Sequence, residues 1–192
     1  MEPTSSSNKE TIIAIKTFVD AVSLPASDIN TYLTNSGLVF VKQQTVGNGV
    51  SSVAVTGAFS TDYDNYKVIY AGGVGSNAVA IQMVLGASVT GYYIGLQYVT
   101  YSTGLVSGTS GNNAASWSFV GEASPGKTSI NIDLLSPFLA KNTVISGSYA
   151  GSVGGSISGF HDVATSFTGF TLTTAGNTMT GGTITILGYR KT

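Results

Sequence analysis

The segment that most limits how this chain can fold is residues 59–73, FSTDYDNYKVIYAGG. Its aspartates and asparagine are typical of a turn, and the β-branched and aromatic residues that follow are typical of a strand. In a pleated strand, Tyr66, Val68 and Tyr70 share one face, and the residues between them lie on the other. The pattern predicts a turn and then a strand that ends at Gly72.

The same spacing of aromatic residues occurs a second time near the C-terminus. In both places the order is aromatic-x-x-aromatic-x-aliphatic, and each copy runs from a polar turn to a glycine. The members are Tyr63, Tyr66 and Val68 in the first copy, and Phe167, Phe170 and Leu172 in the second. We interpret the two copies as aromatic corners in the core of one β-sandwich. Coincidence in a chain rich in aromatic residues is the alternative.

Residues 1–36 have a helical pattern and are predicted to form a short N-terminal arm. Apolar residues recur at spacings of three and four over a predicted helix at about 9–23. This stripe consists of Ile12, Ile15, Val19 and Val22. A helix of this length is marginal in water and needs a surface to pack against. That surface is either the chain's own sandwich or a partner protein, in which case the stripe is an anchor or an oligomer contact.

From residue 38 onward the hydrophobic pattern is that of β-strands. About ten short strands without intervening helices are typical of a sandwich or barrel. The predicted strands are 38–46, 50–59, 66–71, 78–85, 91–101, 115–121, 128–135, 143–151, 155–163, 167–174 and 181–190. We interpret 47–49, Gly-Asn-Gly, as a hairpin turn between the first two strands, and 103–115 as a loop of small residues.

Composition excludes several classes of function. Charged residues are only 9% of the 192-residue chain, the net charge is −1, and residues 68–121 contain no charged residue. A nucleic-acid ligand is not expected without a basic patch. Every apolar run is interrupted by polar or small residues, so neither a transmembrane helix nor a signal peptide is predicted. The absence of cysteine excludes a disulfide framework and a Cys-ligated zinc site. A surface with few charged residues and a net charge near zero favours association with a partner protein.

One motif suggests nucleotide binding but lies in an unsuitable context. Residues 121–128, GEASPGKT, match the G-x-x-x-x-G-K-[ST] pattern of phosphate-binding loops. Such a loop needs a helix after it, whose N-terminus faces the phosphates. Ile130, Ile132 and Leu134 instead alternate as in a strand, so we interpret Pro125-Gly126 as a hairpin turn. No nucleotide cofactor is expected.

The residues capable of acid–base chemistry are few and poorly spaced for catalysis. His161 is the only histidine, and Asp162 follows it directly. Neighbouring residues of a strand point to opposite faces, so Asp162 cannot easily orient the ring as in a Ser-His-Asp triad. Asp62 and Asp64 could hold calcium, although capping of a turn is the preferred interpretation. No catalytic, cofactor-binding or metal-binding residue is therefore assigned.

Aromatic residues are the remaining candidates for ligand contacts. They could stack on sugar rings, or they could pack in the core, and the sequence leaves both alternatives open. These residues are Tyr92, Tyr93, Tyr98, Tyr101 and Trp117.

Three segments of the chain resemble a known group of proteins. The segments are NTYLTNSGLVFVKQQTVGNGVSSVAVTGAFSTDYDNYKVIYAGG, GYYIGLQYVTY and SGFHDVATSFTGFTLTTAGNTMTGGTITILGYR. They resemble β-modules of tailed-bacteriophage virion proteins, which include capsid-decoration, head-fibre and tail-fibre-like proteins. The resemblance covers roughly residues 30–192. It implies a jelly-roll-like antiparallel β-sandwich, usually trimeric, on the outside of a virion.

Together these observations lead to the expectation of a non-enzymatic virion structural protein, made in the host cytoplasm. Residues 1–36 would anchor it to the major capsid protein or a tail component. Residues 37–192 would form a trimeric knob of a capsid decoration, cement or head-fibre protein. One alternative is a short tail fibre that recognises host surface polysaccharide. Another is a polysaccharide depolymerase on the same scaffold, which the lack of paired carboxylates disfavours.

Overall fold

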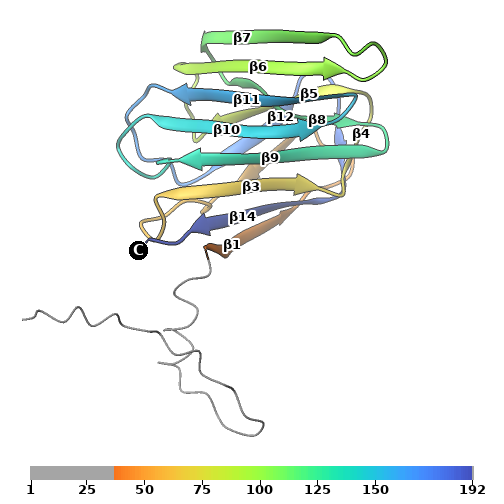
Figure 1. Cartoon of the computed structure of the whole chain (residues 1–192). Coiled ribbons are helices and arrows are strands. Elements are labelled where there is room, and N and C mark those ends of the chain that lie inside the picture. Colours follow the sequence, from red (N-terminus) through yellow and green to blue (C-terminus); the bar gives the residue numbers. More distant parts are fainter. Residues whose placement is uncertain (1–36, 192) are drawn as a thin grey trace, which may run out of the picture. The chain divides into compact units, whose positions relative to one another are not determined.

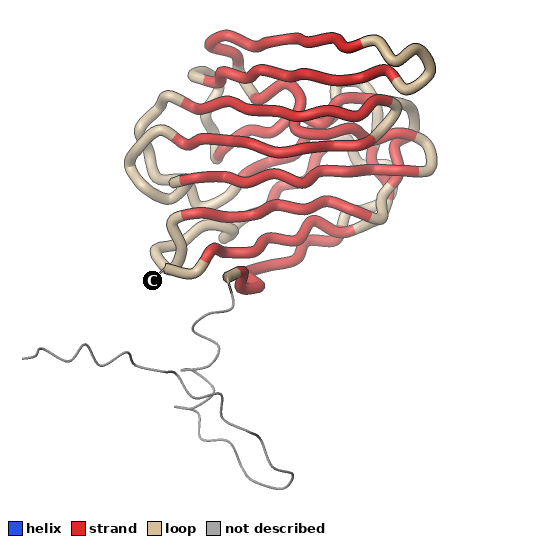
Figure 2. The backbone as a smooth tube through the Cα atoms, viewed as in Figure 1, coloured by secondary structure: helices blue, strands red, loops and turns tan. Residues whose placement is uncertain are grey.

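A computed structural model describes residues 37–191, and this part of the chain consists of strands and loops without a helix (Figures 1 and 2). The expected helix and its stripe, Ile12 to Val22, lie outside the described residues. All paired strands are antiparallel. The strands are β1 (Leu38–Thr45), β2 (Ser52–Val55), β3 (Asn65–Ala71), β4 (Val74–Gly75), β5 (Val79–Leu85), β6 (Tyr92–Thr100), β7 (Val106–Ala114), β8 (Trp117–Ser124), β9 (Lys127–Leu135), β10 (Thr143–Ala150), β11 (Val153–His161), β12 (Phe170–Thr174), β13 (Met179–Thr180) and β14 (Thr183–Tyr189).

Two layers of strands face each other, which confirms the mainly β, sandwich-like prediction. The large layer has the order β1-β14-β3-β9-β10-β11-β6-β7 and faces the viewer in Figure 1. The small layer has the order β2-β12-β5-β8 and lies behind it. The two layers are continuous through the hairpin of β8 and β9, because the start of β9 pairs with β8 and the rest of it with β3 and β10.

The pairings that build the two layers are nested along the chain. The first strand pairs with the last, β1 with β14, and inside that pair lie β2 with β12, β3 with β9 and β5 with β8. Two hairpins interrupt this order: β6–β7 follows β5, and β10–β11 follows β9. Both hairpins extend the large layer beyond β9, where β11 pairs with β6.

The core lies between the layers and follows from the alternation of side chains. In β3, Tyr66, Val68 and Tyr70 are fully buried, as the pattern of the sequence predicted. Val68 lies opposite Ile132 of β9 on one side and Ile186 of β14 on the other. Burial of each large apolar side chain contributes about 1.5–3 kcal/mol, so these cross-strand rows supply much of the stability of the sandwich.

The two aromatic corners lie in opposite layers and meet at one phenylalanine. Tyr66 in β3 and Phe170 in β12 both contact Phe59, with ring centroids 4.8 Å and 5.8 Å from it. Tyr63 packs edge-on against Tyr66 at 5.9 Å and is half-buried, whereas Phe167 is buried. The corners therefore join the two layers through Phe59.

Two local predictions were wrong. The Gly-Asn-Gly turn at 47–49 does not close a hairpin, because β1 pairs with β14 and β2 with β12. Instead, the turn carries the chain from the large layer to the small one, and Gly49 has a positive φ of 62°. The predicted loop at 103–115 contains β7, which pairs with β6. Its glycines, serines and asparagines have low strand propensity, and the backbone ladder with β6 overrides that propensity.

Candidate functional site

The segment that matches a phosphate-binding loop, residues 121–128, belongs to the hairpin of β8 and β9. Ser124 pairs with Lys127, and Gly126 has the positive φ of 84° that a tight turn requires. The hairpin prediction is confirmed. The backbone N–H groups of this turn do not lead into a helix, so the geometry that cradles phosphate is not formed here.

His161 is fully buried in an aromatic cluster, and Asp162 beside it is exposed. The imidazole lies 4.3 Å from the ring of Tyr92, 5.3 Å from Phe167 and 6.5 Å from Trp117. This burial lowers the pKa of His161, because it disfavours the charged form of the ring. The ring is therefore held neutral as part of the core.

The one serine in contact with this histidine is not arranged as a nucleophile. The Ser88 hydroxyl lies 2.8 Å from Nε2 of His161, and the same Nε2 lies 3.1 Å from the carbonyl oxygen of Thr90. A carbonyl oxygen only accepts hydrogen bonds, so Nε2 carries the proton and donates it. The Ser88 hydroxyl in turn donates to Thr90 O at 3.2 Å. Nε2 in this tautomer cannot take the serine proton, which a nucleophilic dyad would require.

Four of the five carboxylates in residues 37–191, all except Asp162, are engaged in contacts that hold the fold together. Asp62 and Glu122 accept hydrogen bonds: Asp62 from the Ser60 hydroxyl, and Glu122 from the backbone N–H and the hydroxyl of Ser152 at 2.7 Å and 2.8 Å. Asp64 forms an ion pair with Lys191 at 2.8 Å. Asp133 forms an ion pair with Lys67 at 3.2 Å. Asp133 also accepts a hydrogen bond of 2.6 Å from Tyr189, which raises the pKa of that phenol to about 12. Within residues 37–191 no three His, Cys, Asp or Glu residues gather as metal ligands.

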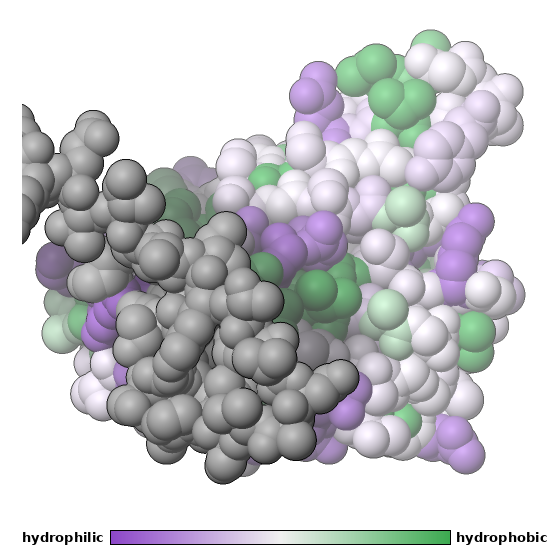
Figure 3. Space-filling view, turned by 60° about the horizontal axis from the view of Figure 1, so that its bottom comes forward, coloured by the Kyte–Doolittle hydropathy of each residue, from purple (hydrophilic) through white to green (hydrophobic). Residues whose placement is uncertain are grey.

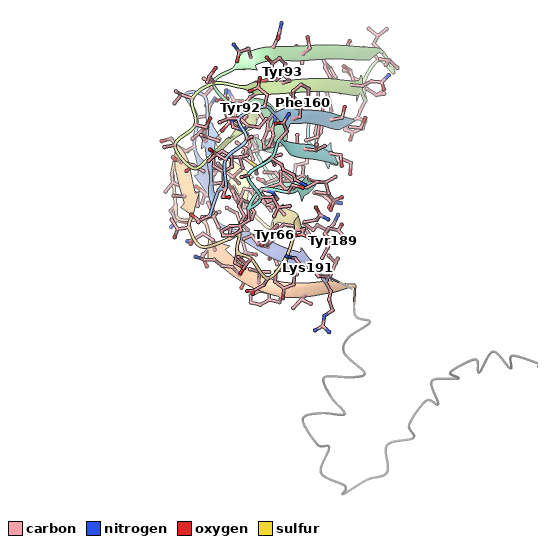
Figure 4. The ribbon with its side chains drawn as sticks, turned by 90° about the vertical axis from the view of Figure 1, so that its left-hand side faces the viewer. Tyr66, Tyr92, Tyr93, Phe160, Tyr189 and Lys191 are labelled. Carbon is pink, nitrogen blue, oxygen red and sulfur yellow. The ribbon has the colours of Figure 1, made fainter. Side chains whose placement is uncertain are left out.

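The outward face of the large layer carries an apolar row across four neighbouring strands. The register places Leu135 of β9 opposite Val144 of β10, which lies opposite Phe160 of β11, which lies opposite Tyr93 of β6. The first three side chains are 39%, 40% and 40% exposed. The rings of Phe160 and Tyr93 stack at 4.6 Å with an interplanar angle of 11° (Figure 4). We call these four residues the apolar row.

A polar trough lies beside the apolar row on the same face. Its volume is about 550 Å³, and it runs over β11, β6 and β7. Every second residue of these strands faces the trough, and these residues are glycines or have a hydroxyl or amide side chain. They are Ser156 and Ser158 of β11, Gly95 and Gln97 of β6, and Gly108 and Ser110 of β7. We call these six residues the polar trough.

An aromatic ring lies near one end of this trough. Tyr101 follows β6 and is 60% exposed. Its ring lies over Gly154 of β11, so closely that a Cβ atom at Gly154 would be 2.3 Å from the phenolic oxygen. Gly154 is two residues before Ser156 on the same face, so the ring of Tyr101 lies directly beyond the trough.

The five aromatic candidates are thus divided between the core and the surface. Tyr92 and Trp117 are fully buried, and Tyr98 is half-buried against the core. Tyr93 and Tyr101 lie on the outward face, at the apolar row and beyond the trough. The sequence interpretation missed the serines and Gln97 of the trough. Alternation of small residues in GSISGF and of glycine with glutamine in IGLQ is the signal that could have indicated them.

No family model, no curated protein and no solved structure matches this chain. Among residues 37–191 there is no helix that could span a bilayer. Much of the surface visible in Figure 3 is pale, between hydrophilic and hydrophobic, as expected from a chain rich in glycine, serine and threonine. The function of this chain is therefore inferred from its fold and from the outward face of the large layer.

Proposed function

We propose that this chain is a non-enzymatic structural protein of a tailed-bacteriophage virion, whose sandwich is a jelly roll. The nested pairing of the first strand with the last and of each inner pair carries this proposal. Eight strands paired in this way form a folded ribbon rolled into two facing layers, the arrangement typical of jelly rolls. Jelly rolls are common in viral capsid proteins and lectins, and the resemblance in sequence points to the virion.

The apolar row is proposed as the contact with neighbouring copies in a homotrimer. An apolar strip across four strands of a flat layer is unusual on a free surface and is typical of interfaces. Lys67 and Asp133 beside the row at β9 form an ion pair within one chain, so they do not oppose approach of a second copy, whereas the carboxylate of Asp162 lies beside Tyr93 at the other end of the row. Three-fold assembly would suit a knob that decorates a capsid or forms the end of a head fibre.

The arm at 1–36 is proposed to anchor the knob to the particle. The stripe from Ile12 to Val22 would lie in a groove of the major capsid protein or a tail component. The strands belong to one compact unit, Ser36–Thr192, and we expect this unit to fold without the arm.

Immunogold labelling of intact virions, with antibodies against the purified chain, tests the placement. We expect label on the particle surface, and particles without label would contradict the proposal. A chain that begins at Ser36 should fold but should not restore decoration to particles that lack the protein. If the shortened chain restored decoration as well as the full chain, the anchor would lie on the sandwich.

Light scattering tests the trimer. We expect a trimer for the wild-type chain and a smaller species for Val144→Lys, which places a charge in the apolar row. Ser148→Lys is the matched control, because Ser148 lies on the same strand and face but outside the row. A stable wild-type monomer at micromolar concentration would contradict the trimer, and equal effects of both lysines would contradict the assignment to the row.

A further inference from the structure

The polar trough offers hydrogen-bonding groups that the fold leaves free. Within residues 37–191, the amide of Gln97 and the hydroxyls of Ser156 and Ser158 make no side-chain hydrogen bond. An amide offers donors and acceptors together, and so does a hydroxyl. A ligand that fits the trough must therefore present both kinds of group along its length, as the hydroxyls of a sugar chain do.

Charge narrows the class of ligand further. Residues 92–121 and 142–161, which contain all three strands of the trough, include no Asp, Glu, Lys or Arg. A phosphate, a carboxylated sugar or a charged peptide would find no opposite charge to compensate for its loss of water. A neutral ligand gives up less hydration free energy when it enters the trough, so the trough favours neutral ligands over charged ones.

The ring of Tyr101, near the end of the trough, offers an apolar face on which a sugar ring can stack. Tyr101 combines an exposed ring face with a hydroxyl, a pairing that suits a ligand with one C–H face and many hydroxyls. Gly154 beneath it leaves room for the ring to lie low on the sheet, because any side chain at this position would displace the ring.

We propose that the polar trough binds a neutral glycan, with Gln97, Ser156 and Ser158 as hydrogen-bonding partners and Tyr101 as the stacking surface. Neighbouring groups along a strand are spaced by about 6.6 Å and across strands by about 4.8 Å. The ladder between β11 and β6 fixes these spacings, with Ser156 opposite Gln97 and Ser158 opposite Gly95. Little ordering is then required when a chain of sugars binds along the trough.

This proposal goes beyond the structural role proposed above and does not depend on it. The trough lies on β11, β6 and β7, whereas the test of assembly uses the apolar row and the arm. A chain that decorates virions without binding glycans would overturn only the glycan site. A chain that binds glycans but is absent from virions would overturn only the structural role.

An array of neutral and anionic oligosaccharides, probed with the full chain, is the first experiment. We expect binding to neutral members, and the best of them then serves as the probe in calorimetry. Failure to bind any neutral oligosaccharide would overturn the proposal. A preference for the anionic members would overturn it as well, because the trough has no cation to recognise them.

Gly95→Ile tests whether binding occurs in the trough. Gly95 has an ordinary strand conformation, and a Cβ atom there would meet only Ser158, at 3.8 Å and 4.0 Å. The side chain should therefore fill the trough without loss of stability and abolish binding of the probe. Thr185→Ile is the matched control, since Thr185 also faces outward but lies on β14, five strands and about 24 Å away. Binding that survives Gly95→Ile, or that Thr185→Ile also abolishes, would overturn the site.

Two further variants test the assigned roles. Tyr101→Ala and Gln97→Ala should each weaken binding of the probe about tenfold, an amount that one lost stacking or amide contact can account for. Both side chains are at the surface, so the urea midpoint of unfolding should stay unchanged. Unchanged affinity in both variants would overturn the roles assigned to them.

Discussion

Phe59→Ala is the most direct test of how the two layers are held together. Phe59 is 2% exposed and contacts an aromatic ring from each layer, Tyr66 at 4.8 Å and Phe170 at 5.8 Å. Replacing a buried phenylalanine by alanine typically costs about 3–5 kcal/mol, from lost transfer energy and from the cavity that remains. In a domain of this size the melting temperature should fall by about 6–20 °C.

Two matched variants separate the contribution of the aromatic ring pairs from that of buried apolar volume, and both from the effect of removing an exposed phenylalanine. Phe59→Leu keeps most of the buried apolar volume but loses both ring pairs, which are worth about 0.5–1.5 kcal/mol each. We therefore expect it to cost about 1–3 kcal/mol. Phe40→Ala removes a phenylalanine that is 62% exposed. It should change the free energy of unfolding by no more than about 0.5 kcal/mol.

Urea unfolding followed by tryptophan fluorescence is the suitable assay. Trp117 is the only tryptophan of the chain and is fully buried, so its emission reports loss of the core. The free energies of unfolding come from the midpoints and slopes of the transitions. A cost of less than about 1 kcal/mol for Phe59→Ala would refute the reasoning. So would a cost equal to that of Phe40→Ala.

Three more predictions concern polar groups that are buried or hydrogen-bonded within the sandwich. Burial lowers the pKa of His161 below its ordinary value of 6.5, so this side chain binds a proton more readily in the unfolded chain than in the folded one. The urea midpoint of unfolding should therefore fall as the pH drops below 6.5. In His161→Phe this dependence of the midpoint on pH should be smaller. The pKa of Tyr189 is raised from 10.0 to about 12, mainly by its hydrogen bond to Asp133, so the stability that this bond contributes should be lost as the pH rises from 10 toward 12. Tyr189→Phe should remove that alkaline loss from the urea midpoints. Glu122 is 4% exposed and accepts two hydrogen bonds from Ser152, so Glu122→Ala should lower the free energy of unfolding by about 1.5–3 kcal/mol for each charge-assisted bond lost.

The relation between the apolar row and the polar trough has a consequence for assembly. Phe160 and Tyr93 form the end of the row, and the trough begins beside them on the same strands. A trimer that covers the row would leave the end of the trough at Tyr101 open. Figure 4 shows Tyr93 and Phe160 near the upper end of the sandwich, and Tyr66 and Tyr189 in its lower half.

Some elements were determined by local sequence alone. The alternation of Tyr66, Val68 and Tyr70 predicted the buried face of β3, because side chains two residues apart in a strand always share a face. Pro125-Gly126 predicted the hairpin of β8 and β9, because only glycine readily takes a positive φ there. The opposite burial of His161 and Asp162 followed from the same alternation.

Other elements were decided only by tertiary structure. The local pattern at 47–49 was that of a hairpin, yet β1 lies beside β14, which is more than a hundred residues away in the chain. Strand β7 has the composition of a loop and becomes a strand because β6 offers a free backbone edge. The pairing of β1 cannot be derived from neighbouring residues, since it depends on which distant strand buries more of the chain. Strand β7 pairs with the strand directly before it, but its composition alone did not indicate a strand.

In the candidate site, too, some features follow from local sequence and others only from tertiary structure. Single residues such as Tyr101 were noticed for their chemistry, but Gln97, Ser156 and Gly108 are unremarkable in their own strands. They form a trough only because β11, β6 and β7 are neighbours in one register. The sequence by itself determined which side chains face outward, through the two-residue period of a strand. The tertiary structure decided which outward side chains lie together, because strand order and register are set by the burial of the whole sandwich.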